Sequence, residues 1–275
     1  MLQRNYYYLV AGLPDIIPDQ AKTIITVTDL VEELRQHLHP EDIKLVEMLL
    51  LTSDNRNLLN ILLKQITAFD NRGNFTFDEL EEGIKEPETL PPYFGHFIAA
   101  FKNNTSLFSE LSWEDQLTSL YYDYVRSTKN DFLQRWFEFD LNMRNVLSAL
   151  SARRIKFPVE KYLIGDNQVN DMLRKSNARD FNLTGEFPLI EKMIQISEQA
   201  NPLEREKSFD ILRWNYIDEL NTFNYFSIEV IIGYIIKLCI VERWLKLDKK
   251  TGQELFVRFI TDLEKSYEFP KVFIV

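Results

Sequence analysis

The sequence predicts an all-α protein. Only 8 glycines and 10 prolines occur among 275 residues, so turns are sparse and the elements between them are long. Hydrophobic residues make up 45% of the chain and aromatic residues 13%, enough for a sizeable core and too much for a mainly disordered protein. Within residues 132–150, large apolar side chains recur at steps of four and three, as on the buried face of a helix: Phe132, Trp136, Phe139, Met143, Val146 and Leu150.

The first quarter of the chain is expected to form an extended lead and a three-helix bundle. Residues 6–8 are three tyrosines, and the glycine and proline that follow them end any regular element quickly. Asp29 is expected to cap a first helix, and Pro40 to open a second. Asp54 is expected to cap a third helix, and the polar stretch 69–89 to be irregular.

The middle and end of the chain contain the longest predicted helices. Apolar residues at helical spacing predict a helix near 94–101, and Ser112 has the pattern of a helix cap. The helix at 131–154 follows. After Pro158 the chain is expected to form shorter elements, with loops near 165 and at 181–185. Asn201 and Pro202 are expected to begin another helix.

A second long helix is predicted from Ser227 to about residue 247. Thr251 and Gly252 are expected to separate it from a last helix, and the apolar tail 269–275 to dock onto the body or onto a partner. No segment has the composition of a flexible linker, so we expect one domain over residues 1–275.

Charge and apolar runs limit the environment of the protein. The net charge of −10 disfavours a nonspecific grip on nucleic acid or on anionic lipid. The single cysteine, Cys239, lies in an apolar helical run and is expected to be a core residue. The first residues lack the apolar stretch of a signal peptide, and the run 230–236 is far shorter than the ~18 residues of a membrane span. We therefore expect a cytoplasmic protein with no nucleic-acid partner and no direct membrane insertion.

A calcium loop, a zinc site and a nucleotide site are each weakly supported. Gly73 and Glu79 fit positions six and twelve of an EF-hand loop, but that register puts Ala68 at position one and Arg72 at position five. An Asx-type turn is the preferred interpretation. His37 and His39 do not share a helix face, and neither a cysteine–histidine cluster nor a phosphate-binding glycine loop is present. We expect no metal and no cofactor.

The acidic pairs do not point to an enzyme. Catalytic carboxylates are partly buried with shifted pKa values, whereas residues 32–33 and 81–82 lie in very polar contexts that are typical of a solvated helix face. We therefore expect a protein that is not an enzyme.

The helix at 131–154 carries polar residues beside its apolar seam. Asp140 and Arg144 are four apart, which predicts an intrahelical ion pair. Glu138, Asn142 and Asn145 are expected to form a polar stripe opposite the seam, either as ordinary surface or as a second contact face.

Two helices carry a resemblance to a known family. Arg144-Asn145-Val146 and Ala152-Arg153 resemble the Arg-Asn-aliphatic…Arg-Ala-Lys helix of the C-subunit family of the V-type and archaeal-type ATPases, whose eukaryotic member is the d subunit. Tyr234 and Glu242-Arg243 are similar to the C-terminal helix of that family, with the likeness covering about a third of the chain. Leu147, Ser151 and Gly12 stand where the family has basic residues. The likeness is to a divergent bacterial branch, encoded among V-type ATPase subunits in Bacteroidetes-like organisms.

The resemblance implies a helical funnel of three related units around a pseudo-threefold axis, at about 1–110, 111–200 and 201–275. It implies a non-catalytic central-stalk protein that receives the D and F subunits of the shaft, rests on the membrane rotor ring and transmits torque during ion or proton transport. The partner interface is then expected at seven polar residues: Glu138, Asn142, Arg144, Asn145, Arg153, Glu242 and Arg243. The alternatives are an unrelated cytoplasmic helical adaptor or scaffold, and an enzyme whose pocket would hold pKa-shifted carboxylates.

Overall fold

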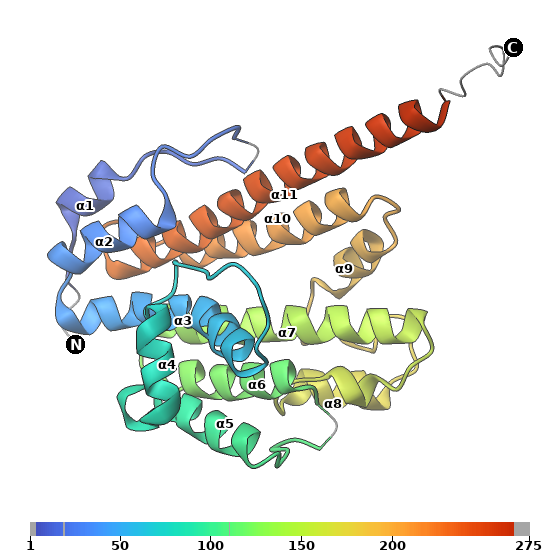
Figure 1. The fold of residues 1–275 in the computed structure, drawn as a ribbon, viewed down its shortest axis with the longest axis horizontal. Helices are drawn as coiled ribbons and strands as arrows, with labels where there is room; N and C mark the ends of the chain where they lie inside the picture. Colours follow the sequence, from blue (N-terminus) through green and yellow to red (C-terminus); the bar gives the residue numbers. More distant parts are fainter. Residues whose placement is uncertain (1–3, 19, 110, 267–275) are drawn as a thin grey trace, which may run out of the picture.

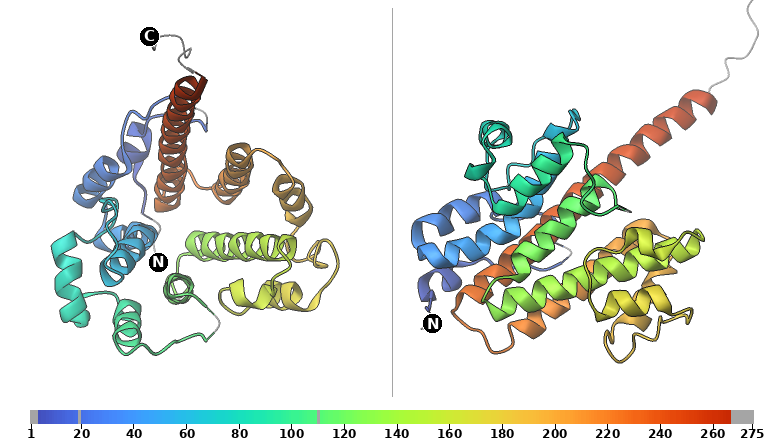
Figure 2. Two further views of the ribbon diagram at one scale, coloured as in Figure 1. Left: turned by 45° about the vertical axis from the view of Figure 1, so that its right-hand side comes forward. Right: turned by 90° about the horizontal axis from the view of Figure 1, so that it is seen from below.

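All regular structure in the described part of the chain is helical, which confirms the predicted fold class (Figure 1). The computed structural model describes residues 4–18, 20–109 and 111–266, with side chains described as far as residue 247. Successive helices follow one another around the molecule in chain order, as the first view of Figure 2 shows.

Three pairs of helices organise this arrangement. In each pair a shorter helix is followed by a long one, and the long helices contain 23, 24 and 39 residues. The pairs are α2 (Val27–His37) with α3 (Pro40–Leu62), α6 (Trp113–Arg126) with α7 (Asp131–Arg154), and α10 (Pro202–Leu220) with α11 (Ile228–Ser266). The remaining elements are α1 (Tyr7–Gly12), α4 (Phe77–Lys85), α5 (Pro92–Lys102), α8 (Gln168–Lys175), α9 (Ile190–Ser197) and the 3-10 turns η1 (Pro87–Thr89) and η2 (Val159–Tyr162).

Polar caps explain where several helices begin. The predicted starts at Pro40, Ser112 and Asn201 are confirmed, and the Ser112 side chain accepts the N–H of Asp115 at the start of α6. The expected cap at Asp29 is wrong. Thr26 caps α2 instead, because its hydroxyl oxygen accepts the N–H of Asp29, which lies in the first turn.

Two predicted helix boundaries do not exist. Asp54 was expected to cap a helix, but α3 runs through it without a break and its carboxylate faces a loop from the following segment. Thr251 and Gly252 were expected to separate two helices, but α11 continues through them to Ser266. A helix-interior glycine costs about 1 kcal/mol relative to alanine, which is too little to end a helix that is otherwise favourable.

Two segments predicted as irregular contain helices. The N-terminal lead forms α1, and the stretch 69–89 contains α4 and η1. Helix α4 begins with a capping box in which Thr76 and Glu79 each accept the other's backbone N–H, a short-range signal that its polar composition concealed. The tail 269–275, expected to dock onto the body or a partner, lies outside the described residues.

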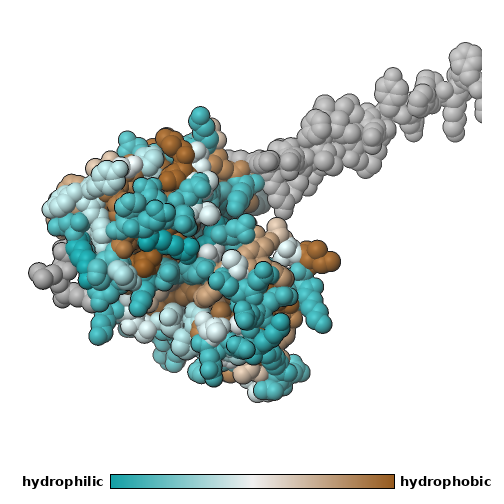
Figure 3. Space-filling view, turned by 60° about the vertical axis from the view of Figure 1, so that its left-hand side comes forward, coloured by the Kyte–Doolittle hydropathy of each residue, from teal (hydrophilic) through white to brown (hydrophobic). Residues whose placement is uncertain are grey.

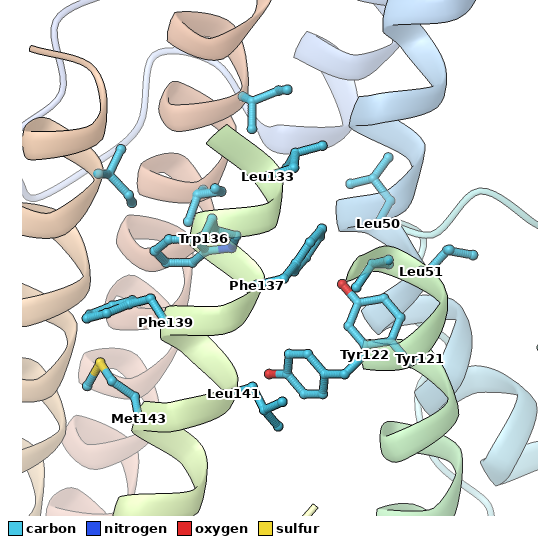
Figure 4. Close-up of a cluster of buried hydrophobic side chains, with 14 of the residues drawn as sticks. Leu50, Leu51, Tyr121, Tyr122, Leu133, Trp136, Phe137, Phe139, Leu141 and Met143 are labelled. Atoms are coloured by element: carbon cyan, nitrogen blue, oxygen red, sulfur yellow. The ribbon is translucent and has the colours of Figure 1, made fainter. Parts of the chain in front are cut away.

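Helix α7 lies at the centre of the core. Its predicted apolar seam is buried at Phe132, Trp136, Phe139, Met143 and Val146, and Leu150 packs at its edge. The other side of the helix is also buried, because Leu133, Phe137 and Leu141 face α3 and α6 (Figure 4). Phe139 stacks on Tyr216 of α10, with ring centroids 3.8 Å apart. Helix α7 is therefore packed on two sides, and it keeps a solvated edge at Gln134, Arg135 and Glu138.

Cys239 of α11 is a free thiol that packs against the main core, in agreement with its predicted role. Burial raises the pKa of this thiol to about 12, so it is protonated at neutral pH.

The close approach of α10 and α11 depends on Gly233. A Cβ atom at this position would lie 2.4 Å from Asn221 Nδ2 and 2.9 Å from Ile217 Cγ2, both on or at the end of α10. We expect Gly233→Ala to lower the free energy of unfolding by about 1–3 kcal/mol, because the helices must move apart.

Gly95→Ala, within α5, is the matched control. Its Cβ would meet only ordinary contacts, the nearest 3.5 Å away, so this substitution should raise the free energy of unfolding by up to about 1 kcal/mol. Urea denaturation of both variants measures the change in the free energy of unfolding, which should be negative for Gly233→Ala and positive for Gly95→Ala. A Gly233→Ala variant as stable as the parent protein would contradict close packing here.

Candidate functional site

Polar side chains of α7 hold the segment that follows it. Asn145 donates from Nδ2 to the carbonyl oxygen of Ile164 and accepts the Ile164 N–H at Oδ1, both at 2.9 Å. Asn170 also donates to the Ile164 carbonyl, at 2.8 Å, and Asn142 accepts from the side chain of Asn167 at 2.8 Å. Asn142 and Asn145 are buried. They satisfy loop groups that would otherwise be unpaired, so the expected polar surface stripe is wrong at these two positions.

Arg153 holds the next part of the same segment. Its guanidinium donates to the carbonyl oxygens of Ser176 and Ala178 and lies over the ring of Phe181, 3.4 Å from the centroid. Burial lowers the pKa of Arg153, and the carbonyl dipoles and the aromatic face compensate the charge.

Asp140 and Arg144 do not pair with each other. Arg144 binds Asp115 in the first turn of α6 at 2.8 Å, whereas Asp140 binds Arg213 of α10 at 3.1 Å. The predicted intrahelical ion pair is wrong because each residue has a partner on a neighbouring helix. Both therefore connect α7 to the helices beside it.

A buried polar network continues from Asp140 through α10 to α11. Asp140 accepts from Tyr122 at 2.7 Å and from Arg213, which also reaches Asp210 at 3.3 Å. Asp210 is 1% exposed and accepts a further hydrogen bond from Trp244 Nε1 at 2.7 Å. The network thus joins four helices: α6, α7, α10 and α11.

The charges of this network compensate one another. Arg243 of α11 also binds Asp210, so this buried carboxylate is paired with two guanidinium groups. Burial lowers the pKa of Arg213, but the carboxylates of Asp140 and Asp210 outweigh that effect and the net pKa is raised. Burial, reinforced by the Asp140 carboxylate, raises the pKa of Tyr122 well above its ordinary value. All of these side chains are held in fixed contacts.

Glu242 of α11 connects this C-terminal helix to α2, near the start of the chain. Its Oε1 accepts the N–H of Val27 at 2.7 Å, at the first turn of α2, and its Oε2 lies 3.9 Å from Arg72. A carboxylate is favourable at this position because the helix N-terminus has unpaired N–H groups and a positive dipole end. Glu242 therefore fixes α11 to α2, 215 residues away in sequence.

The loop before α4 was considered as a calcium site, but its carboxylates face hydrogen-bond donors. Asp54 accepts the N–H groups of Asn74 and Phe75, and Asp70 forms an ion pair with Arg72 at 2.6 Å. The Arg72 N–H donates to Asp70 Oδ1 at 3.2 Å, which confirms the Asx-type turn. Gly73 is required here, since a Cβ atom would lie 2.1 Å from Asp54 Oδ1.

The two carboxyl groups of this loop have opposite pKa shifts. Burial raises the pKa of Asp54 to about 6 and outweighs the hydrogen bonds from Asn74 and Phe75. Burial also opposes ionisation of Asp70, but the Arg72 guanidinium outweighs it and lowers the pKa of that carboxyl. Among the described residues, no group of three or more histidine, cysteine, aspartate or glutamate side chains could hold a metal ion.

A related pattern on α3 was missed in the sequence. Arg56-Asn57-Leu58-Leu59 matches Arg144-Asn145-Val146-Leu147 of α7 in residue type and order. Asn57 donates to the carbonyl oxygen of Asp70 and accepts the Asp70 N–H, both at 2.9 Å, as Asn145 does with Ile164. Each arginine lies beside an aspartate, with Arg56 3.9 Å from Asp70. The recurrence of Arg-Asn followed by two aliphatic residues was the signal in the sequence that could have revealed this similarity.

Of the seven predicted interface residues, six bind within the chain. Asn142, Asn145 and Arg153 hold the segment after α7, whereas Arg144, Glu242 and Arg243 connect helices. Glu138 is exposed on α7. The structure does not gather the seven residues into one surface, and a role for them in binding a partner stays a prediction.

A different surface displays aromatic side chains. The turn between α10 and α11 meets α1, because the Tyr6 N–H donates to the carbonyl oxygen of Phe226 and the rings of Tyr7 and Phe226 are 4.7 Å apart. The aromatic surface comprises five exposed side chains, with exposed fractions from 39% to 87%: Tyr7, Tyr8, Phe223, Tyr225 and Phe226. The face seen in Figure 3 is largely hydrophilic, with hydrophobic side chains in separate groups.

Two hollows lie on the described surface. One, of about 330 Å³, is lined mainly by apolar residues of α1 and α2, with Glu33 among them. The other, of about 470 Å³, contains Asp123, whose pKa is raised by burial, together with Asp166 and Arg174, which bind each other at 3.1 Å. The acidic pairs at 32–33 and 81–82 are exposed, as expected. None of the described helices is both long enough and apolar enough to cross a membrane.

The chain belongs to a family of proteins of unknown function (DUF2764), whose model matches residues 3–267. No curated protein and no solved structure matches the chain.

We expect the protein to lose much of its stability when the contacts of Asp210 are removed. Asp210→Ala leaves the partly buried Arg213 guanidinium with one carboxylate fewer and removes the acceptor of Trp244 Nε1. We expect the free energy of unfolding to fall by about 3–5 kcal/mol, measured by urea denaturation. Asp218→Ala is the matched control, because Asp218 lies on the same helix but is 59% exposed, and its pair with Lys237 should contribute under about 1 kcal/mol. Equal losses in the two variants would contradict the assigned role.

The Asp54 carboxyl predicts a pH dependence. Its native pKa of about 6 lies above the ordinary value of 3.8, so its contribution to stability is fully present below pH 3.8 and is lost as the pH rises through about 6. Between pH 7 and pH 5, the native protein should gain about 1 kcal/mol relative to Asp54→Asn, which lacks this titration. Urea denaturation of both proteins at the two pH values measures the difference, and an identical pH dependence would refute it.

Proposed function

We propose that this protein is a non-catalytic central-stalk coupling component of a V-type or archaeal-type rotary ATPase. In this role it links the D and F subunits of the shaft to the membrane rotor ring, on the cytoplasmic side and peripherally associated with the membrane through the complex. The observation that carries the proposal is the matching Arg-Asn pattern of α3 and α7, in which each asparagine binds one loop residue through both backbone groups.

The arrangement of helices supports repeated units. Helices α3, α7 and α11 begin at residues 40, 131 and 228, which are separated by 91 and 97 residues, and each follows a shorter helix. Their starts fall within the three proposed units, 1–110, 111–200 and 201–275. Helix α11 carries Arg243 beside Asp210, as α7 carries Arg144 beside Asp115. The spacing and the paired arginines agree with the three-unit funnel that the family resemblance implies.

A coupling component has to resist deformation, and the interior offers a physical basis for stiffness. The Asp210 network links α6, α7, α10 and α11, and Glu242 fixes α11 to the first turn of α2. Because such contacts have specific geometry and the surrounding core is closely packed, relative movement of the helices would break several interactions at once. This behaviour suits a part that transmits torque.

The aromatic surface gives the proposed coupling component a place for a protein partner. Tyrosine and phenylalanine are enriched at protein interfaces, and Phe223 and Tyr225 are 87% and 69% exposed. Residues 221–228 contain no charged side chain, so a partner could cover them without desolvating an ion. Glu138 is the exposed member of the predicted interface set on α7.

Affinity purification from native membranes tests the proposal. The tagged full-length protein should co-purify with the nucleotide-binding subunits, the shaft and the rotor ring under conditions that keep the complex whole, and should show no turnover of its own. An eluate without ATPase subunits would refute the coupling role.

Surface variants locate the contact. Phe223→Ser combined with Tyr225→Ser should reduce recovered ATPase subunits about tenfold, because truncating two interface aromatics typically costs more than 1 kcal/mol. Ile66→Ser is the matched control, since it removes a fully exposed apolar side chain outside the aromatic surface. Glu138→Lys, compared with Glu82→Lys on α4, tests the remaining exposed position. Recovery equal to the controls would place the contact elsewhere.

A further inference from the structure

The end of α7 forms a small basic and apolar knob on an acidic protein. After the helix ends, the chain turns and enters η2. Within residues 154–162, three cationic and three large apolar or aromatic side chains are exposed, with the apolar ones 37–56% exposed: Arg154, Ile155, Lys156, Phe157, Lys161 and Tyr162. Glu160 is the one acid in this stretch, so the knob carries a local positive charge although the chain as a whole carries −10.

The backbone of the knob is fixed by the way α7 ends. The Phe157 N–H donates to the carbonyl oxygen of Ala152 at 2.9 Å, and the Lys156 N–H donates to that of Arg153 at 3.1 Å, the two bonds of a Schellman turn. This turn places Lys156 at φ +58°, the left-handed region that favours glycine. A lysine in this region carries a conformational cost, and the two hydrogen bonds of the turn hold it there.

The anchoring of Arg153 adds to this rigidity. Because its guanidinium binds Ser176 and Ala178 and covers Phe181, the base of the knob is fixed to the segment after α8. Lys156 and Phe157 therefore project from a fixed base.

We propose that this knob docks onto the surface of a bilayer containing anionic lipid. Exposed lysine and arginine attract acidic headgroups, and an aromatic ring beside them fits the depth at which headgroups meet the acyl chains. Acids outside the knob repel the same surface, including Asp123 and Asp166 of the hollow that Glu160 also lines, but charges more than about 10 Å from the lipid are screened at 0.1 M salt. The contact is a local surface attachment through the turn at the end of α7. It does not rest on the proposed coupling role.

The alternative partner for the knob is an acidic groove on another protein. The exposed Phe157 ring beside the cations favours a lipid surface, which needs no matching cavity. The competing chemistry becomes an outcome of the test.

Vesicle flotation with the full chain tests the proposal. At 50 mM salt the protein should float with phosphatidylglycerol vesicles and not with phosphatidylcholine vesicles, and 0.5 M salt should release it. Lys156→Gly should weaken binding about fivefold, the usual effect of one cation near an anionic surface. Phe157→Ser should weaken it about tenfold, through loss of buried apolar area.

Lys64→Gly is the matched control. Lys64 occupies the same left-handed position in the turn that ends α3, with φ +54°, but it is the single charged residue of the stretch 57–69. Both glycine variants should keep or raise the melting temperature, because glycine suits this conformation, and only Lys156→Gly should lose vesicle binding.

Four results would overturn the proposal. The first is absence of binding to phosphatidylglycerol, and the second is equal binding to both lipids. The third is an equal effect of the two glycine variants. The fourth is binding of soluble polyglutamate without vesicle binding, which would assign the knob to an acidic protein surface. Because vesicles contain no ATPase subunits, none of these results depends on whether the coupling role is correct.

Discussion

The packing of the long helices depends on one constraint: loops that cross buried helix surface carry backbone N–H and C=O groups that must be paired. Side chains from the helices supply the partners. Asn57 and Asn145 each bind both backbone groups of one loop residue, Asp54 accepts two consecutive N–H groups, and Glu242 accepts an N–H at the start of α2. An unpaired buried group costs about 1–3 kcal/mol, so these polar residues decide where each loop can lie on its helix.

Charge placement follows from the same constraint. Asp210 is buried and Arg213 partly buried, and an ion pair removed from water contributes little net stability compared with apolar residues of similar volume. Its structural effect is to select an arrangement, because either charge alone in this position would be costly. Tyr122, Asp140 and Trp244 complete the contacts, so the relative positions of four helices are determined by one connected group of side chains. Apolar packing around α7 supplies the larger share of the burial, but it is less specific about register.

The sequence predicted the elements whose signals are local. Helix α7 has the predicted bounds, and the caps at Ser112 and Asn201 lie where their spacing indicated. Errors arose where a residue with a local signal acts over a long distance. Asp54 has the residue type of a helix cap, yet the residue that it binds lies 20 positions away in the sequence. Asp140 has the spacing of an intrahelical ion pair with Arg144, yet its partner Arg213 lies 73 positions away. The polar stripe failed for the same reason, since periodicity alone cannot show that Asn145 faces a loop.

The residues that carry the resemblance to the ATPase C-subunit family make internal contacts, and this limits what the resemblance says about binding partners. Arg144, Asn145 and Glu242 would be retained in any protein with this interior, whatever it binds, because each completes an internal contact. Their pattern therefore supports the repeated architecture from which the coupling role is proposed, and the residues that contact a partner have to be sought among side chains that the fold leaves exposed. The aromatic surface meets that condition, because hydrogen bonds and ring contacts fix its backbone while its side chains remain exposed to solvent. An uncharged aromatic surface on a fixed backbone loses little backbone entropy and little ion solvation on binding, and both effects lower the cost of a contact with another protein.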